Sequence, residues 1–154
     1  MLTLVRKRPA KNITPGGKKY YRRGRPIGRA LFSDRSQITL RILAYAADEA
    51  DVTALLRARI EAAVAFRESL AIDATACRLV HGEADGLPGL IVDRYGDTLV
   101  AQFLSAGVER WKDVLVDALL EATGRTKFYE RSDASGRERE GLKPVTGWLR
   151  GEGA

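Results

Sequence analysis

The chain has 154 residues, a formal net charge of +6 and a single cysteine, Cys77. This length suffices for one ordinary domain, or two small ones, with a buried core. One cysteine excludes a disulfide within the chain and a zinc site of several cysteines, and it fits a reducing, cytoplasmic setting. No stretch approaches the roughly eighteen apolar residues that span a membrane. The basic start, residues 1–12, lacks the apolar core of a signal peptide.

The charge is unevenly distributed along the chain. Residues 1–41 hold twelve Lys or Arg and one acid, whereas the remainder holds fourteen bases and nineteen acids. Clustered bases release condensed counterions from phosphates, so a basic block on a mildly acidic body indicates a polyanionic partner. Residues 1–22 show no periodicity, and a solvated or disordered basic tail is an equally good interpretation of them. Tyr20 and Tyr21 lie among these bases and are of the kind that stacks on unpaired nucleobases.

Residues 25–44 predict two strands, RPIGRALF and SQITLRILA, because apolar and polar residues alternate in the second of them. The SDRS sequence at their junction is typical of a turn, in which Asp34 and Ser36 bond nearby backbone N–H groups. We therefore expect Arg35 at the tip of a hairpin, beside an outward-facing Arg41.

Residues 51–70 predict an amphipathic helix that links this small β unit to a second unit beginning near Ala76. The apolar positions expected on its buried face are Val52, Leu56, Ile60, Ala63, Phe66 and Leu70.

The second unit is predicted as three strands, a helix and two strands. The strands are expected at roughly 78–83, 89–94, 98–104, 126–131 and 145–150. Gly96 in the YGDT turn closes a hairpin between the second and third strands. The helix covers residues 107–124 and ends at Gly124. Its apolar face is formed by Val108, Trp111, Leu115, Ala118, Leu119 and Ala122. An antiparallel sheet with one packed helix is an α+β architecture.

The chain's only histidine, His81, lies close in sequence to three carboxylates: Glu83, Asp85 and Asp93. This group resembles an acid–base or metal site, but a metal needs three or more convergent ligands, and no second histidine exists. Carboxylates in Gly- and Pro-containing turns usually bond their own backbone, so a scaffold is the favoured interpretation. Cys77 has no histidine at a recognisable spacing and is expected to be a buried, inert thiol.

The sequence shows no nucleotide-binding loop. GLPGL, at residues 86–90, has neither the dinucleotide nor the P-loop glycine spacing, and a strand rather than a helix follows it. Nowhere is there the strand, glycine-rich turn, helix and acidic residue of a dinucleotide or S-adenosylmethionine fold. A second polar segment, YERSDASGRERE at residues 129–140, brings Arg131 and Asp133 together. They form either a weak surface ion pair or a contact to a phosphate or to another domain.

Five segments of the chain resemble one enzyme family. They are GRPIGRALFSDRSQITLRIL, AFRESL, RLVHGEADGLPGLIVDRYGD, LVAQFLSAGVERW and YERSDASGRERE with the following GL. In this order they are similar to the N-terminal half of the class I S-adenosylmethionine-dependent methyltransferases that make 5-methylcytosine in 23S ribosomal RNA. The resemblance covers about Gly24 to Glu152. It implies an N-terminal PUA domain, a small RNA-binding β barrel, followed by a central domain whose core contains the His81 stretch.

Both ends of the chain depart from the family pattern. An HPWVFSG-like stretch, usual in the first half of the PUA domain, is not visible in residues 1–23, which look like an unrelated basic run. The chain stops at Ala154, about where the domain that binds S-adenosylmethionine and carries the catalytic cysteine would begin, and Cys77 does not stand in that catalytic motif. The resemblance therefore implies a chain with no catalytic residues or cofactor of its own, whose full-length relatives use S-adenosylmethionine.

The resemblance divides the chain into four parts: an irregular basic segment at 1–23, a partial PUA-like β unit at 24–44, a linker helix at 45–75 and a central α+β domain at 76–154. The first hypothesis is a non-catalytic, RNA-binding part of a 23S ribosomal RNA cytosine methyltransferase. The expected RNA contacts are Lys18, Lys19, Arg22, Arg23, Arg25, Arg35, Gln37 and Arg41. The alternatives are a module that docks onto a separate methyltransferase subunit, or a truncated product without independent activity. Partners are expected to be ribosomal RNA and either a methyltransferase domain or a second copy, with no metal and no membrane.

Overall fold

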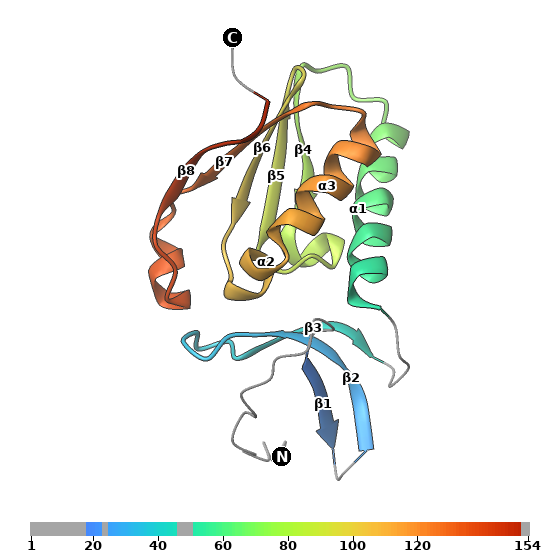
Figure 1. The fold of residues 1–154 in the computed structure, drawn as a ribbon. Coiled ribbons are helices and arrows are strands. Elements are labelled where there is room, and N and C mark those ends of the chain that lie inside the picture. Colours follow the sequence, from blue (N-terminus) through green and yellow to red (C-terminus); the bar gives the residue numbers. More distant parts are fainter. Residues whose placement is uncertain (1–17, 23–24, 46–50, 152–154) are drawn as a thin grey trace.

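The computed structural model describes residues 18–22, 25–45 and 51–151. A three-stranded antiparallel sheet lies at one end of the molecule, below the larger second unit in Figure 1. Its strands, in spatial order, are β1 (Lys18–Arg22), β2 (Arg25–Phe32) and β3 (Leu40–Tyr45).

The strand β1 corrects the prediction of an irregular segment at residues 18–22. Its residues pair with β2, from Lys18 opposite Ala30 to Arg22 opposite Arg25. Tyr20 and Tyr21, at its centre, belong to the aromatic residues that favour extended strands. Those two tyrosines were the available signal for a strand, and the surrounding bases obscured it.

A five-stranded sheet forms the second unit, and all five predicted strands are present with ends shifted by at most two residues. They are β4 (Ala76–His81), β5 (Leu90–Tyr95), β6 (Thr98–Phe103), β7 (Lys127–Ser132) and β8 (Val145–Arg150), in that spatial order. The sheet is mixed rather than antiparallel, because β6 and β7 are parallel while the other neighbours are antiparallel. The helical crossover between β6 and β7 returns the chain to the end where β6 began, which makes that pair parallel.

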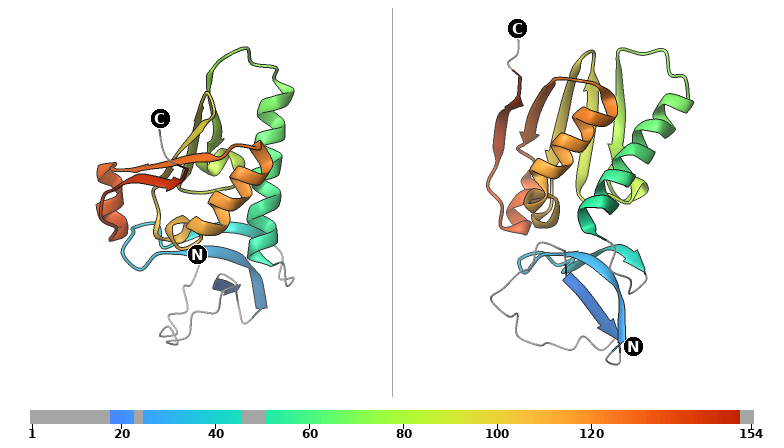
Figure 2. Two further views of the ribbon diagram at one scale, coloured as in Figure 1. Left: turned by 45° about the horizontal axis from the view of Figure 1, so that its top comes forward. Right: turned by 45° about the vertical axis from the view of Figure 1, so that its right-hand side comes forward.

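Two helices rather than one pack on this sheet. The helices α1 (Val52–Ser69) and α3 (Lys112–Thr123) contact each other and cover the same face (Figures 1 and 2). The segment predicted to link the units is therefore part of the core of the second unit. The helix predicted over 107–124 is divided at Trp111 into α2 (Ala106–Arg110) and α3.

The buried face of α1 differs from the prediction in its last turn. The buried residues are Val52, Leu56, Ile60, Ala63 and Val64. Phe66 and Leu70 are 54% and 51% exposed, so their placement on that face was wrong. At 100° per residue, Val64 lies about 40° from Ile60 around the helix, whereas Phe66 lies about 120° away. Among the described residues, no helix combines the length and apolar character needed to cross a bilayer.

The N-terminal sheet packs directly onto the second unit through a close approach at Gly107 of α2. A Cβ atom at Gly107 would lie 2.4 Å from the Cβ of Leu31 on β2, so only glycine permits this contact. On the other side of the junction, the Arg59 guanidinium on α1 donates hydrogen bonds to the carbonyls of Leu43 on β3 and Gly86. These contacts fix where the basic sheet stands relative to the rest of the chain.

Candidate nucleic-acid interface

The loop at residues 33–39, between β2 and β3, is held by two serine side chains. Ser33 Oγ accepts a hydrogen bond from the Ser36 N–H at 3.1 Å, and Ser36 Oγ accepts one from the Ile38 N–H at 3.1 Å. The expected role of Ser36 is confirmed, whereas Ser33 takes the role predicted for Asp34. This bonding leaves Arg35 and Gln37 exposed at the loop, as expected for polar contacts to RNA.

Most of the other predicted RNA contacts lie on the first two strands. Lys18, Lys19, Arg22 and Arg25 belong to β1 or β2, while Arg23 lies outside the described residues. The strand register places Lys19 opposite Arg29, and Arg22 opposite Arg25. Bases thus occupy paired positions of the two strands, and a concentration of positive charge of this kind attracts a polyanion.

Arg41 has a different environment from the one predicted. Its Nη2 atom donates a hydrogen bond to Glu140 Oε1 at 2.8 Å, and the two side chains are only 16% and 4% exposed. The expectation that Arg41 faces outward was wrong, because it shares a sheet face with its partner Leu31, and that face packs on the second unit. Arg41 is therefore less accessible to RNA than Arg35, which is exposed.

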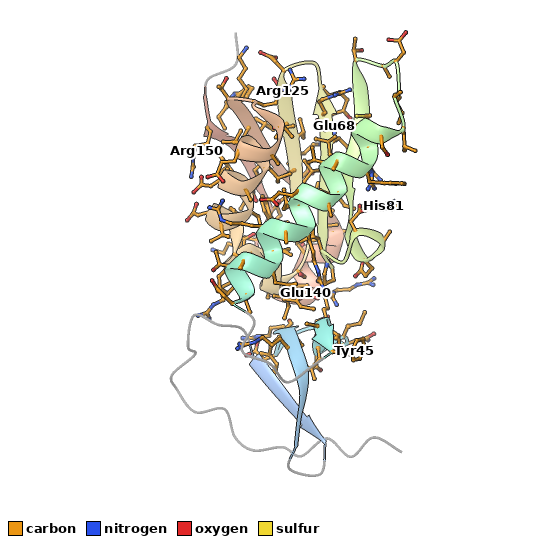
Figure 3. All side chains as sticks on the ribbon, turned by 90° about the vertical axis from the view of Figure 1, so that its right-hand side faces the viewer. Tyr45, Glu68, His81, Arg125, Glu140 and Arg150 are labelled. Atoms are coloured by element: carbon orange, nitrogen blue, oxygen red, sulfur yellow. The ribbon has the colours of Figure 1, made fainter. Side chains whose placement is uncertain are left out.

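Glu140 joins the two units of the fold. Its second oxygen, Oε2, accepts a hydrogen bond from the Ala106 N–H at the start of α2, 3.1 Å away. Burial on its own would raise the pKa of the Glu140 carboxyl. Hydrogen bonds from Ser36, Ala106 and Ser33, together with the charge of Arg41, outweigh burial and hold the pKa below its ordinary value. Figure 3 shows Glu140 close to the N-terminal sheet that carries Tyr45.

A buried ionic network begins three residues before Glu140. Arg137 precedes it in a short 3-10 helix, η2 (Ser135–Glu140), and is 1% exposed. Its Nε donates to the Lys143 carbonyl at 3.0 Å, and its Nη1 donates to the Phe103 carbonyl and to Glu109 Oε2, the latter at 3.0 Å. The guanidinium thus links the segment just before β8 to the end of β6.

Lys112 extends the network to β7. Its Nζ lies 2.7 Å from Glu109 Oε1 and 2.9 Å from Glu130 Oε2, and the Glu130 side chain is 1% exposed. Every charge in this chain of contacts has an opposite partner, which is what a structural network requires and leaves no group free for proton transfer. These residues were not predicted from the sequence, because the network joins segments far apart in the chain.

The other predicted contact pair, Arg131 and Asp133, lies on the surface. The two side chains are 67% and 50% exposed, and Arg131 Nε is 3.7 Å from the Asp133 carboxylate, beyond hydrogen-bonding distance. This is the weak surface pair that the sequence suggested. It leaves the Arg131 guanidinium accessible.

The residues around His81 do not converge on a common point. Asp85 accepts two hydrogen bonds from Arg67, at 2.6 and 2.8 Å, and one from the His81 N–H at 2.6 Å. Asp93 accepts two from Arg78, at 2.8 and 3.2 Å. Asp85 and Asp93 thus each have their own arginine on the scaffold, while the third carboxylate of the group, Glu83, is exposed. Within the described residues there is no group of three or more His, Cys, Asp or Glu that could hold a metal ion.

The Arg67–Asp85 pair predicts how stability depends on pH. Burial opposes ionisation of Asp85, but hydrogen bonds from Arg67 and the His81 N–H and the charges of Arg67 and His81 lower its pKa. The folded pKa therefore lies below the unfolded one, near 3.9, so the carboxylate stabilises the fold above that pH and ceases to do so as the pH falls through the folded value.

Asp85→Asn is expected to cost about 2 kcal/mol of unfolding free energy at pH 7, between the values for surface and buried pairs, and less near pH 3. Urea denaturation at the two pH values checks this, with Asp73→Asn, at an exposed site, as the control. An equal cost at both pH values would contradict the assignment.

The helix that follows the parallel strand of the sheet does not fit S-adenosylmethionine. In folds that bind such cofactors, the helix N-terminus after a parallel strand is left open for the ligand. Here α2 follows the parallel strand β6, and its first N–H groups are already taken by Glu140, at Ala106, and by the Ser105 side chain, at Val108. Gly89 offers no cradle either, because a Cβ there would lie 2.6 Å from Ser105 Oγ.

Comparison with known proteins gives the family context. No protein-family profile matches the chain. It is 44% identical over 131 residues to ribosomal RNA large subunit methyltransferase I of Shewanella denitrificans, and 44% identical over 135 residues to the protein of the same name in Aliivibrio fischeri. Over these residues the chain is similar to proteins named as ribosomal RNA methyltransferases. These matches cover 84% and 86% of the chain but only 33% and 34% of the relatives, so the chain spans about a third of their length.

Two solved structures share the fold. A putative SAM-dependent methyltransferase from Streptococcus mutans superimposes with a TM-score of 0.68 at 20% identity, over 84% of this chain and 33% of that one. A putative methyltransferase solved in complex with SAH gives a TM-score of 0.63 at 19% identity, over 84% of this chain and 32% of the other. The mixed α+β arrangement is thus one that occurs as part of larger methyltransferase chains.

Proposed function

We propose that the chain is an RNA-binding, non-catalytic part of a SAM-dependent methyltransferase that modifies cytosine in 23S ribosomal RNA. In this proposal the three-stranded sheet is a PUA-like unit. The observation that carries the proposal is the register of β1 and β2, which places bases directly opposite bases on a sheet packed against the second unit. The names of the relatives support ribosomal RNA as the polyanion.

The residues proposed to contact RNA differ in their support. The bases at the paired strands, with Arg35 and Gln37 at the exposed loop, form the contact surface; Arg23 remains a proposal outside the described residues. Arg41 acts instead through Glu140, by holding the sheet in place. Arginine and lysine contacts to phosphates supply affinity, whereas specificity requires contacts to base edges or to RNA shape. Gln37, which is exposed, is the residue proposed for such a contact.

The test is a fluorescence-anisotropy titration of a labelled 23S ribosomal RNA fragment at low and at physiological salt. Replacing Arg22, Arg25 and Arg35 together by alanine should weaken binding at least tenfold. It should also lower the slope of log affinity against log salt by about 2, because each lost phosphate contact removes about 0.7 to 0.9.

The matched control is Arg125→Ala, at the end of the molecule far from the N-terminal sheet (Figure 3). It removes one positive charge without touching the proposed surface and should leave affinity nearly unchanged. The proposal fails if the triple variant binds as tightly as the unaltered chain, or if Arg125→Ala alone weakens binding to the same extent.

A further inference from the structure

The face of the five-stranded sheet opposite α1 and α3 carries an aromatic pair, a half-buried tyrosine and an exposed tryptophan. Tyr129 on β7 and Trp148 on β8 lie opposite each other in the strand register, with ring centroids 5.2 Å apart and planes at 78°. Phe128 and Glu130, on either side of Tyr129, are buried towards the helices, so alternation along the strand places Tyr129 on the other face. Trp148 is 43% exposed.

The charge around this pair differs from that of the rest of the second unit. Residues 51–126 hold eight bases and twelve acids, whereas residues 127–150 hold six bases and four acids. Two of those four acids, Glu130 and Glu140, and one of the six bases, Arg137, are buried in the ion pairs described above. Arg131 stands one residue beyond Glu130 on β7 and is 67% exposed. The aromatic pair therefore lies in a basic segment, residues 127–150 (the arm), within an otherwise acidic second unit.

The middle of this arm lies beside the proposed RNA surface. A Cβ atom at Gly141, at the end of η2, would lie 2.9 Å from Arg35 Cγ, so the hairpin loop of the N-terminal sheet touches the arm. From there β8 runs along the edge of the five-stranded sheet, away from the N-terminal sheet (Figure 1). The strand β8 thus leads from the loop that carries Arg35 to Trp148.

We propose that Trp148, braced by Tyr129, stacks on an unpaired base of single-stranded RNA while Arg131 contacts a neighbouring phosphate. The inference rests on the proposed function, since it extends the same RNA surface onto the second unit. Every base has a π face, so such stacking selects unpaired over paired RNA rather than one sequence over another. The basic surroundings favour a nucleic acid over a protein partner, which is the other common occupant of an exposed aromatic patch.

The experiment uses the fluorescence of Trp148 in the full chain. The sequence contains one other tryptophan, Trp111, and Trp111→Phe leaves Trp148 as the only tryptophan emitter. This variant is titrated with a twelve-nucleotide RNA, either single-stranded or annealed to its complement, while anisotropy of a label on the RNA reports total binding. Emission should be quenched by the single strand and not by the duplex.

In the chain with Trp111 intact, Trp148→Ala should weaken single-strand binding about tenfold with the salt slope unchanged, because stacking releases no counterions. Trp148→Phe should recover most of the loss. Phe66→Ala is the matched control, because Phe66 is an exposed aromatic on α1, away from the arm, and it should bind as the unaltered chain does.

Three results would overturn the proposal that Trp148 stacks on RNA. Unchanged Trp148 emission while anisotropy reports binding would exclude stacking and leave the proposed RNA function in place. A shift of emission with protein concentration alone, without RNA, would identify the surface as a protein interface. If the chain binds neither the single strand nor the duplex, both the stacking proposal and the proposed function are overturned.

Discussion

Arg137→Met should lower the free energy of unfolding by about 3 to 5 kcal/mol, the usual cost of removing one partner of a buried ion pair. The substitution removes one of the two cationic partners of Glu109, which keeps Lys112, and leaves two carbonyl oxygens, those of Phe103 and Lys143, without their donor. A domain of this size has a total stability of about 5 to 15 kcal/mol, so the loss is large enough to be measured directly by urea denaturation followed by circular dichroism.

The neighbouring Arg139 supplies the control, because it belongs to the same short helix and is exposed. Arg139→Met makes the same chemical change at the surface and should alter stability by no more than about 0.5 kcal/mol. Similar losses in the two variants would mean that helix formation in η2, rather than the buried network, governs the stability of this region.

The strands of the second unit could be predicted because their signals are local. Alternating apolar residues and the turn at Gly96 specify which residues extend and where the chain reverses. The parallel pairing of β6 with β7 was missed, although the intervening helix implied it, since a helical crossover joins parallel strands. The strand β1 was missed because its bases resembled a solvated tail, while its pairing depends on β2.

The surroundings of the candidate site residues were predicted less well, because they depend on contacts between segments far apart in the chain. Alternation correctly separates the two faces of β3 but does not say which face meets another unit, so Arg41 was placed in solvent. Its partner Glu140 lies 99 residues further along the chain. Likewise, SGRERE is a polar sequence with no apolar residue, yet two of its side chains, Arg137 and Glu140, are buried. Burial paid for by long-range ion pairs leaves no periodic trace in a single sequence.

Glu140→Ala should destabilise the chain by about 3 kcal/mol, because it leaves Arg41 buried without its charged partner and removes the acceptor for the Ala106 N–H. Chemical denaturation measures the loss. Glu138→Ala, at an exposed site in the same helix, is the control and should be nearly neutral.

A double-mutant cycle with Arg41→Met then tests whether the two side chains act on each other. If they do, the double variant should be more stable than the sum of the single losses predicts, by about 1 to 3 kcal/mol, because the second change removes the charge that the first left unpaired. Additive losses would contradict the pair and return Arg41 to the solvent-facing role that the sequence suggested.

RNA affinity separates the two cases further. A structural Arg41 loses affinity only when the attachment of the N-terminal sheet is lost, so Glu140→Ala should weaken RNA binding as much as Arg41→Met does. A phosphate-contacting Arg41 would instead make Arg41→Met weaken binding and lower its salt dependence, while Glu140→Ala, which frees the guanidinium, would not.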